Sequence, residues 1–135
     1  MRGDDGILSA FVALLLVALF VLVGLGVDGG SELVAHQAAV AEAEQAARAG
    51  AGAISESGLR RGVVTLVPGE AVARAEWFTL SAGHHGTASV HGKTVTVSVS
   101  YRIPTAILGL VGVTSLPVSA TASAVNLHGV VVGAP

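Results

Sequence analysis

The chain has 135 residues, of which 52% are hydrophobic and only 12% are charged. This composition excludes a disordered polar tail, and its charged fraction is about half of that found in ordinary soluble domains. A net charge of -2 with seven basic residues provides no electrostatic surface for nucleic acid, and the absence of cysteine excludes disulfides and thiolate chemistry.

The hydrophobicity is concentrated near the N-terminus, after a short leader at residues 1–6. Residues 7–27 read ILSAFVALLLVALFVLVGLGV, in which Ser9 is the one polar side chain. As a helix this segment measures about 31 Å at about 1.5 Å per residue, which matches a hydrocarbon core of about 30 Å. The segment therefore predicts a transmembrane helix.

A cleaved secretory signal peptide is the alternative interpretation of this segment. Signal peptides have an apolar core of about 7–15 residues, after a basic leader and before a small-x-small cleavage site. Here the apolar core is longer, the leader MRGDDG carries one arginine against two aspartates, and the nearest such site, residues 39–41, lies well beyond the core. A membrane span is therefore favoured, although Arg2 alone gives little information on its orientation.

Beyond the span, residues 28–56 predict an extramembrane continuation of the helix, with helical composition from residue 32 to about residue 54. At about 100° per residue, small side chains fall on one stripe of this helix. The stripe comprises Ala35, Ala39, Ala43, Ala46, Gly50 and Ala53. Such a stripe permits close packing of a sheet or another helix, the alternative being an alanine-rich surface helix that reflects helix propensity alone.

Gly26 and Gly30 form a G-x-x-x-G pattern at the end of the span. This spacing is typical of two membrane helices that pack together. It is equally compatible with a flexible joint in the helix, because glycine is conformationally permissive.

Residues 57–128 predict a small α+β head, followed by a C-terminal tail at residues 129–135. Residues 63–67 predict a short strand, and Pro68 begins a second helix that extends to about residue 82. A short strand followed by a second helix indicates that a compact head follows the long helix.

Alternating patterns predict the remaining strands of the head. Residues 94–101 form the clearest strand signal, joined across a turn at 91–93 to a strand at 87–90, and residues 118–124 predict a third. Residues 103–113 are apolar but too short to span a bilayer, and predict a connection with a short helix tucked under the sheet. We expect an antiparallel sheet of three to four strands with one face against the long helix.

Residues with catalytic or metal-binding chemistry are few. His84, His85 and His91 cluster near the predicted hairpin, but no carboxylate follows Glu76, and a metal site needs further ligands and supporting partners. Glu70 is poorly placed to share a helix face with Glu76, as a paired-carboxylate site would require. The sequence predicts no enzyme, no cofactor and no metal.

Four stretches carry a resemblance to a known family: residues 6–30, the alanine-rich helix that ends at 44–51, residues 86–97 and residues 104–113. They resemble the TadE/TadG-like proteins of actinobacterial tight-adherence (Tad/Flp) pilus systems, and the similarity covers most of the chain. The resemblance implies a pilin-like fold and a structural or assembly role in a pilus or related secretion system of the bacterial cell envelope. It also implies a single-pass membrane protein with a cytoplasmic N-terminus, an extracellular head and other pilus subunits as partners.

The resemblance further implies cleavage by a prepilin peptidase, which in related proteins cuts after a glycine just before the apolar helix. Gly6 matches that glycine, and Ile7 would become the first residue. Related substrates usually carry a glutamate early in the helix, at the position that Phe11 occupies here. Two alternatives stay open, a secreted binding module and a single-span membrane-anchored regulatory module with no pilus role.

Overall fold

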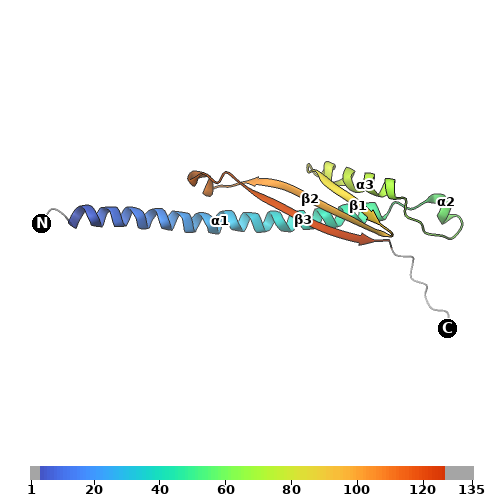
Figure 1. The fold of residues 1–135 in the computed structure, drawn as a ribbon, viewed down its shortest axis with the longest axis horizontal. Coiled ribbons are helices and arrows are strands. Elements are labelled where there is room, and N and C mark those ends of the chain that lie inside the picture. Colours follow the sequence, from blue (N-terminus) through green and yellow to red (C-terminus); the bar gives the residue numbers. More distant parts are fainter. Residues whose placement is uncertain (1–3, 127–135) are drawn as a thin grey trace, which may run out of the picture. The chain divides into compact units, whose positions relative to one another are not determined.

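The computed structural model describes residues 4–126, so the predicted tail at 129–135 lies outside the described residues. The elements in chain order are α1 (Asp4–Ala51), α2 (Glu56–Leu59), α3 (Pro68–Ser81), β1 (Gly86–His91), β2 (Thr94–Pro104), the 3-10 turn η1 (Leu108–Val111) and β3 (Ser115–Val125) (Figure 1). The strands form one three-stranded sheet in the order β1-β2-β3. The predicted α+β class, with a long N-terminal helix on a small antiparallel sheet, is confirmed.

The described chain forms two compact units. The first combines α1 up to Ala35 with Arg102–Pro117, and the second combines His36–Tyr101 with the chain from Val118 onward. Helix α1 and strands β2 and β3 therefore contribute residues to both units. The first unit holds the apolar part of α1, and the second holds the core of the head.

The sheet follows the alternation expected from the sequence. Strands β1 and β2 pair antiparallel from Gly86 with Val99 to His91 with Thr94, and Gly92 turns the hairpin at φ +62°. On β2, Val95, Val97 and Val99 are buried. The hydroxyls of the residues between them meet those of β3, at 2.8 Å for Thr96 with Ser123 and 2.9 Å for Ser98 with Thr121.

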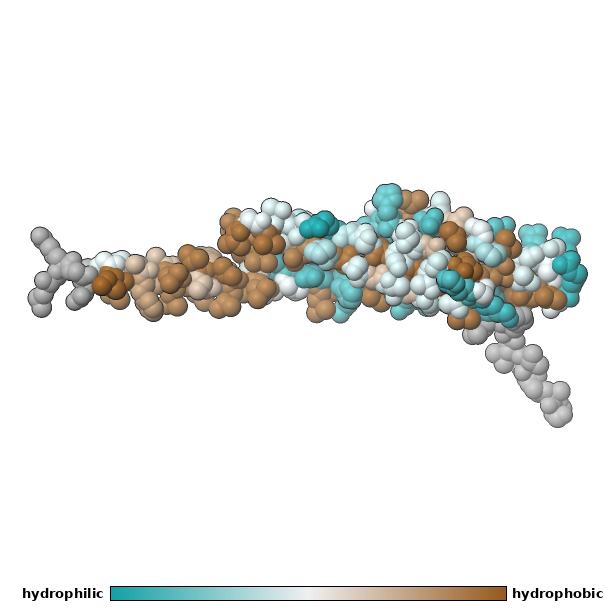
Figure 2. All heavy atoms as spheres, viewed as in Figure 1, coloured by the Kyte–Doolittle hydropathy of each residue, from teal (hydrophilic) through white to brown (hydrophobic). Residues whose placement is uncertain are grey.

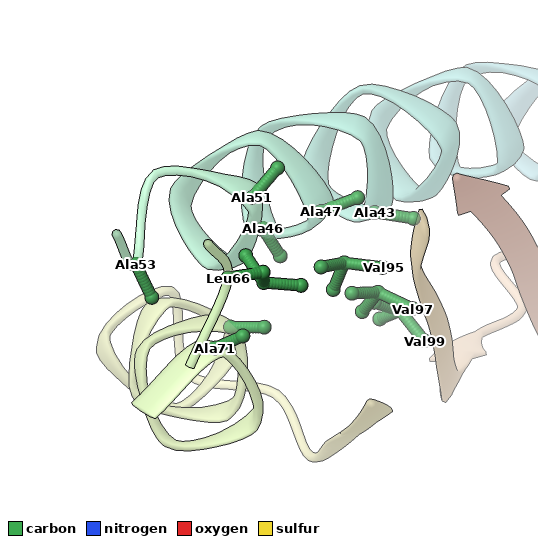
Figure 3. Packing of buried hydrophobic residues seen from close by; sticks show 11 residues of the cluster. Ala43, Ala46, Ala47, Ala51, Ala53, Leu66, Ala71, Val95, Val97 and Val99 are labelled. Atoms are coloured by element: carbon green, nitrogen blue, oxygen red, sulfur yellow. The ribbon is translucent and has the colours of Figure 1, made fainter. Parts of the chain in front are cut away.

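The core of the second unit is made mainly of alanine and valine. Figure 3 shows alanines of α1 directed toward the valines of β2, with Leu66 and Ala71 beside them; the labelled set is Ala43, Ala46, Ala47, Ala51, Ala53, Leu66, Ala71, Val95, Val97 and Val99. At Gly50, an added Cβ would lie 2.8 Å from the Ala71 carbonyl oxygen and 2.9 Å from Val95 Cγ1. Small residues therefore let α1, α3 and the sheet approach closely.

Helix α1 ends earlier than predicted, at Ala51 rather than near residue 54. After it the backbone pairs with a different segment, because Ser55 N–H donates to the Thr65 carbonyl at 2.9 Å and Val67 N–H donates to the Ala53 carbonyl at 3.0 Å. The Asn126 side-chain amide donates to the Ala51 carbonyl at 2.6 Å, which satisfies an acceptor at the helix end.

Two further expectations are wrong. Residues 63–67 do not join the sheet, since Leu66 makes only an isolated antiparallel bridge with Ile54. Residues 103–113 contain the predicted short helix, as η1, but they are not tucked under the sheet. Ile107 packs at Gly24 of α1, and the neighbouring amides of Ala106 and Leu108 donate to Asp28. Hydrophobicity alone predicts that such a connection packs on an apolar neighbour, but not which element it packs on.

Candidate functional site

The N-terminal part of α1 presents an extended apolar surface (Figure 2). Leu14 is 69% exposed and Phe20 is 68% exposed. Among residues 4–126, α1 is the one helix long and apolar enough to cross a membrane, and almost none of its most apolar stretch is buried. This exposure differs from that of a core helix, whose apolar side chains would be covered by the rest of the chain.

A second apolar segment, the 105–114 loop between β2 and β3, lies against this part of α1. In Figure 1 it is the brown turn that follows β2. Ile107 fills the hollow left by Gly24, where an added Cβ would lie 2.8 Å from Ile107 Cγ2. The outer side of the loop is unprotected, because Leu110 is 87% exposed.

An apolar groove lies between the loop and α1. Every residue that lines it is aliphatic or aromatic: Val17, Phe20 and Val21 from α1, and Ile107, Leu108, Leu110 and Val111 from the loop. The groove therefore offers no polar group that could orient a polar ligand.

The carboxylate of Asp28 holds the loop on α1. Its Oδ1 accepts a hydrogen bond from Ala106 N–H at 2.7 Å, and its Oδ2 accepts from Ile107 N–H at 3.1 Å and Leu108 N–H at 2.6 Å. Asp28 is only 2% exposed. The bond from Leu108 lowers the pKa of Asp28, burial opposes this shift, and the bonds from Ala106 and Ile107 reinforce it.

The loop also satisfies backbone groups within itself. Gly112 adopts φ +95°, a left-handed conformation that glycine accepts readily. The donor and acceptor pairs are Thr105 N–H to Thr114 O, Leu110 N–H to Ile107 O, Gly112 N–H to Gly109 O and Val113 N–H to Leu108 O, all between 3.0 and 3.2 Å. Asp28 therefore complements a turn that is already hydrogen-bonded.

Replacing Asp28 with asparagine should loosen the loop. The amide offers one acceptor in place of two charged ones and adds donors facing the loop N–H groups, so hydrogen exchange at residues 106–108 should accelerate by at least about tenfold. The measurement is amide exchange of the full chain in lipid vesicles. Glu32→Gln, one turn further along α1, is the matched control and should leave exchange unchanged.

The same contact should depend on pH in one direction. Because the pKa of Asp28 is lower in the folded protein, its contribution is complete above the ordinary value of about 3.9 and is lost as pH falls through the folded value. Loop protection in the wild-type chain should therefore decrease only in strong acid. Asp28→Asn should lack this transition, and an equal acid response in both proteins would contradict the assignment.

The head contains a second cluster, formed by Glu42, His84 and Tyr101. Glu42 Oε2 lies 2.7 Å from His84 Nδ1, and the imidazole stacks on the Tyr101 ring with centroids 4.0 Å apart. The other oxygen of Glu42 is buried without a hydrogen-bond partner among the described residues. Burial raises the pKa of Tyr101, and the negative charge of Glu42 raises it further.

The three histidines expected to cluster are not brought together. His84 turns toward Glu42, whereas His85 and His91 are exposed. Within the part of the chain that the structure describes, no group of three or more histidine, cysteine, aspartate or glutamate side chains could hold a metal ion. The Glu42–His84 pair fixes α1 to the loop after α3.

The structure gives the members of the predicted small-residue stripe different surroundings. Ala35 is half-buried, whereas the rest are buried, namely Ala39, Ala43, Ala46, Gly50 and Ala53. Ala53 lies beyond the end of α1.

The other predicted glycine sites lie on exposed parts of α1. Gly6, Gly26 and Gly30 are exposed, with nothing within 4 Å of an added Cβ, and Ile7 is exposed as well. The glycine that does pack closely in this unit is Gly24, which sequence reasoning did not select.

Asp28 and Glu42 were also missed as interacting residues. Their partners lie 78–80 and 42 positions away along the chain. A lone carboxylate directly after an apolar run was the available signal for Asp28, because buried charges are normally paired.

Comparisons of the chain with protein-family models, with curated proteins and with solved structures gave no match in any of the three. Within the residues that the structure describes, the fold is α+β, with one helix long and apolar enough to span a membrane.

Proposed function

We propose that the chain is a single-span membrane protein anchored by residues 7–27, and that it serves as a pilin-like structural or assembly subunit of a tight-adherence pilus or related secretion system. The observation that carries this proposal is the continuity of α1 from Asp4 to Ala51. One helix provides both the exposed apolar segment and four alanines of the head core, namely Ala43, Ala46, Ala47 and Ala51.

A continuous helix suits a subunit that moves from the lipid bilayer into an assembly of similar subunits. The apolar side chains of residues 7–27 contact acyl chains in the bilayer and would contact similar helices in an assembly, because both environments are apolar. The head needs no membrane, since its core is closed by its own alanine and valine side chains. The resemblance to TadE/TadG-like proteins supports the partners, a cytoplasmic N-terminus, an external head and cleavage between Gly6 and Ile7.

Crosslinking in intact cells tests the assembly role. A photoreactive amino acid at Leu14, which is exposed on α1, should yield a ladder of adducts with other apolar-helix subunits. The matched control carries the same group at Leu59, an exposed leucine of α2, and reports random collisions. A membrane-anchored regulator should give no ladder from Leu14, which would contradict the proposal.

The intact mass of the same protein separates the remaining alternatives. A start at Ile7 indicates prepilin-type processing, and a start at Met1 or Arg2 indicates an uncleaved, permanently anchored subunit. A start beyond Val27 with the protein in the medium would establish a secreted module and overturn the proposal.

A further inference from the structure

The 105–114 loop lies beside the apolar run of α1 rather than beyond its end. Ile107 packs at Gly24, and the groove brings other loop residues against Phe20. At about 1.5 Å per residue, Gly24 lies about 5 Å and Phe20 about 10 Å before the end of the run at Val27. The loop therefore overlaps the proposed span along the helix axis.

Charged residues restrict where the bilayer can lie along α1. In the uncleaved chain, residues 4 and 5 are aspartates that precede the apolar run, and cleavage after Gly6 would put the charged α-amino group of Ile7 in their place. Asp28 follows the run directly. The run of about 31 Å fills a hydrocarbon core of about 30 Å, so a shift in either direction would move a charged group into hydrocarbon. When residues 7–27 span the hydrocarbon core of the bilayer, the 105–114 loop lies at the depth of the hydrocarbon.

We propose that the 105–114 loop is a second membrane-inserted element, embedded among the acyl chains beside α1 and held there by Asp28. This inference rests on the span in the proposed function. Its partner is the hydrocarbon of the lipid bilayer, and the groove between the loop and α1 is filled by acyl chains.

The composition of the loop fits this partner. Residues 105–114 read TAILGLVGVT and contain no charged side chain. Leu110, Val111 and Val113 are exposed. In water they would form an apolar surface in contact with solvent, and insertion into lipid would remove this surface from water. At the base of the loop, Arg102 Nε donates to Ser115 Oγ at 2.9 Å and provides a cation suited to the headgroup region.

Asp28 pairs the irregular backbone of the loop at the edge of the hydrocarbon. Unpaired N–H groups are strongly unfavourable in lipid, where no water can replace a lost partner. The carboxylate accepts from three successive N–H groups, those of Ala106, Ile107 and Leu108, and the turn pairs further donors within itself. This function explains why a nearly fully buried carboxylate lies directly at the end of the span.

Cysteine labelling can test the insertion, because the chain has no native cysteine. Three single variants of the full chain, Leu14→Cys, Leu33→Cys and Leu110→Cys, replace exposed leucines of the first unit. Each is placed in phosphatidylcholine vesicles at a low protein-to-lipid ratio, so that neighbouring copies do not cover the loop. The probe is a membrane-impermeant maleimide, with labelling after full denaturation as the reference.

Leu33→Cys lies about 9 Å beyond Val27 and should react rapidly. Leu14→Cys and Leu110→Cys should both react at least about tenfold more slowly, because hydrocarbon excludes the reagent and suppresses the thiolate. Protein burial would not explain slow labelling at position 110, since Leu110 is exposed in the structure.

The two proposals fail in different ways. Rapid labelling of Leu110→Cys with slow labelling of Leu14→Cys would overturn insertion of the loop and leave the span intact. Rapid labelling of Leu14→Cys would remove the span itself, and the inserted loop with it.

Discussion

Replacing Leu16 with arginine should release the protein from the membrane fraction and abolish its assembly into a pilus. Leu16 lies near the middle of residues 7–27, and its side chain is exposed on α1. A guanidinium at the centre of a span costs about 2.5–3.5 kcal/mol on insertion scales. The measurement is the fraction of protein that stays with membranes after alkaline carbonate extraction.

The control for this variant is Leu33→Arg, on the same helix beyond Asp28. Leu33 is also exposed, but an arginine there would reach water or headgroups and should leave membrane retention unchanged. Retention of both variants at the wild-type level, with normal pilus formation, would contradict the anchoring role of residues 7–27. Loss of both variants would point to impaired folding of α1 instead.

The sequence could predict those features that depend on short-range patterns. Alternation at Val95, Val97 and Val99 indicated the central strand, and the structure buries all three. The length and composition of residues 7–27 indicated a helix able to span a membrane, which α1 provides. These features can be predicted because residues a few positions apart along the chain determine which face of a strand or helix is apolar.

The contacts that build the candidate site could not be predicted in this way. Asp28 binds amides 78–80 positions away, and Glu42 meets His84 across 42 positions, so neither pair has a local signal. The hydrophobicity of the 105–114 loop is equally compatible with packing under the sheet and packing on α1. The small hollow at Gly24 and the nearby carboxylate favour α1, and both are features of shape and charge that a hydropathy pattern does not contain.

Replacing Ala46 with leucine should destabilise the head by about 1–3 kcal/mol, because overpacking a dense core forces neighbouring side chains to shift. Ala46 is fully buried and belongs to the cluster that includes Leu66, Ala71 and Val95. For a domain of this size, each kcal/mol lowers Tm by about 4–8 °C. The measurement is thermal unfolding of the full chain in detergent micelles, followed by circular dichroism.

The matched control is Ala38→Leu, on the same helix with an exposed side chain. Leucine and alanine are both good helix formers, so this variant should retain the wild-type Tm. Equal stability of the two variants would mean that the alanines of α1 serve helix propensity alone. A lower Tm for Ala46→Leu alone would show that small side chains determine how closely α1 and the sheet pack. Close packing of small side chains would then explain how a head with few large core residues is held on the same helix that provides the apolar anchor.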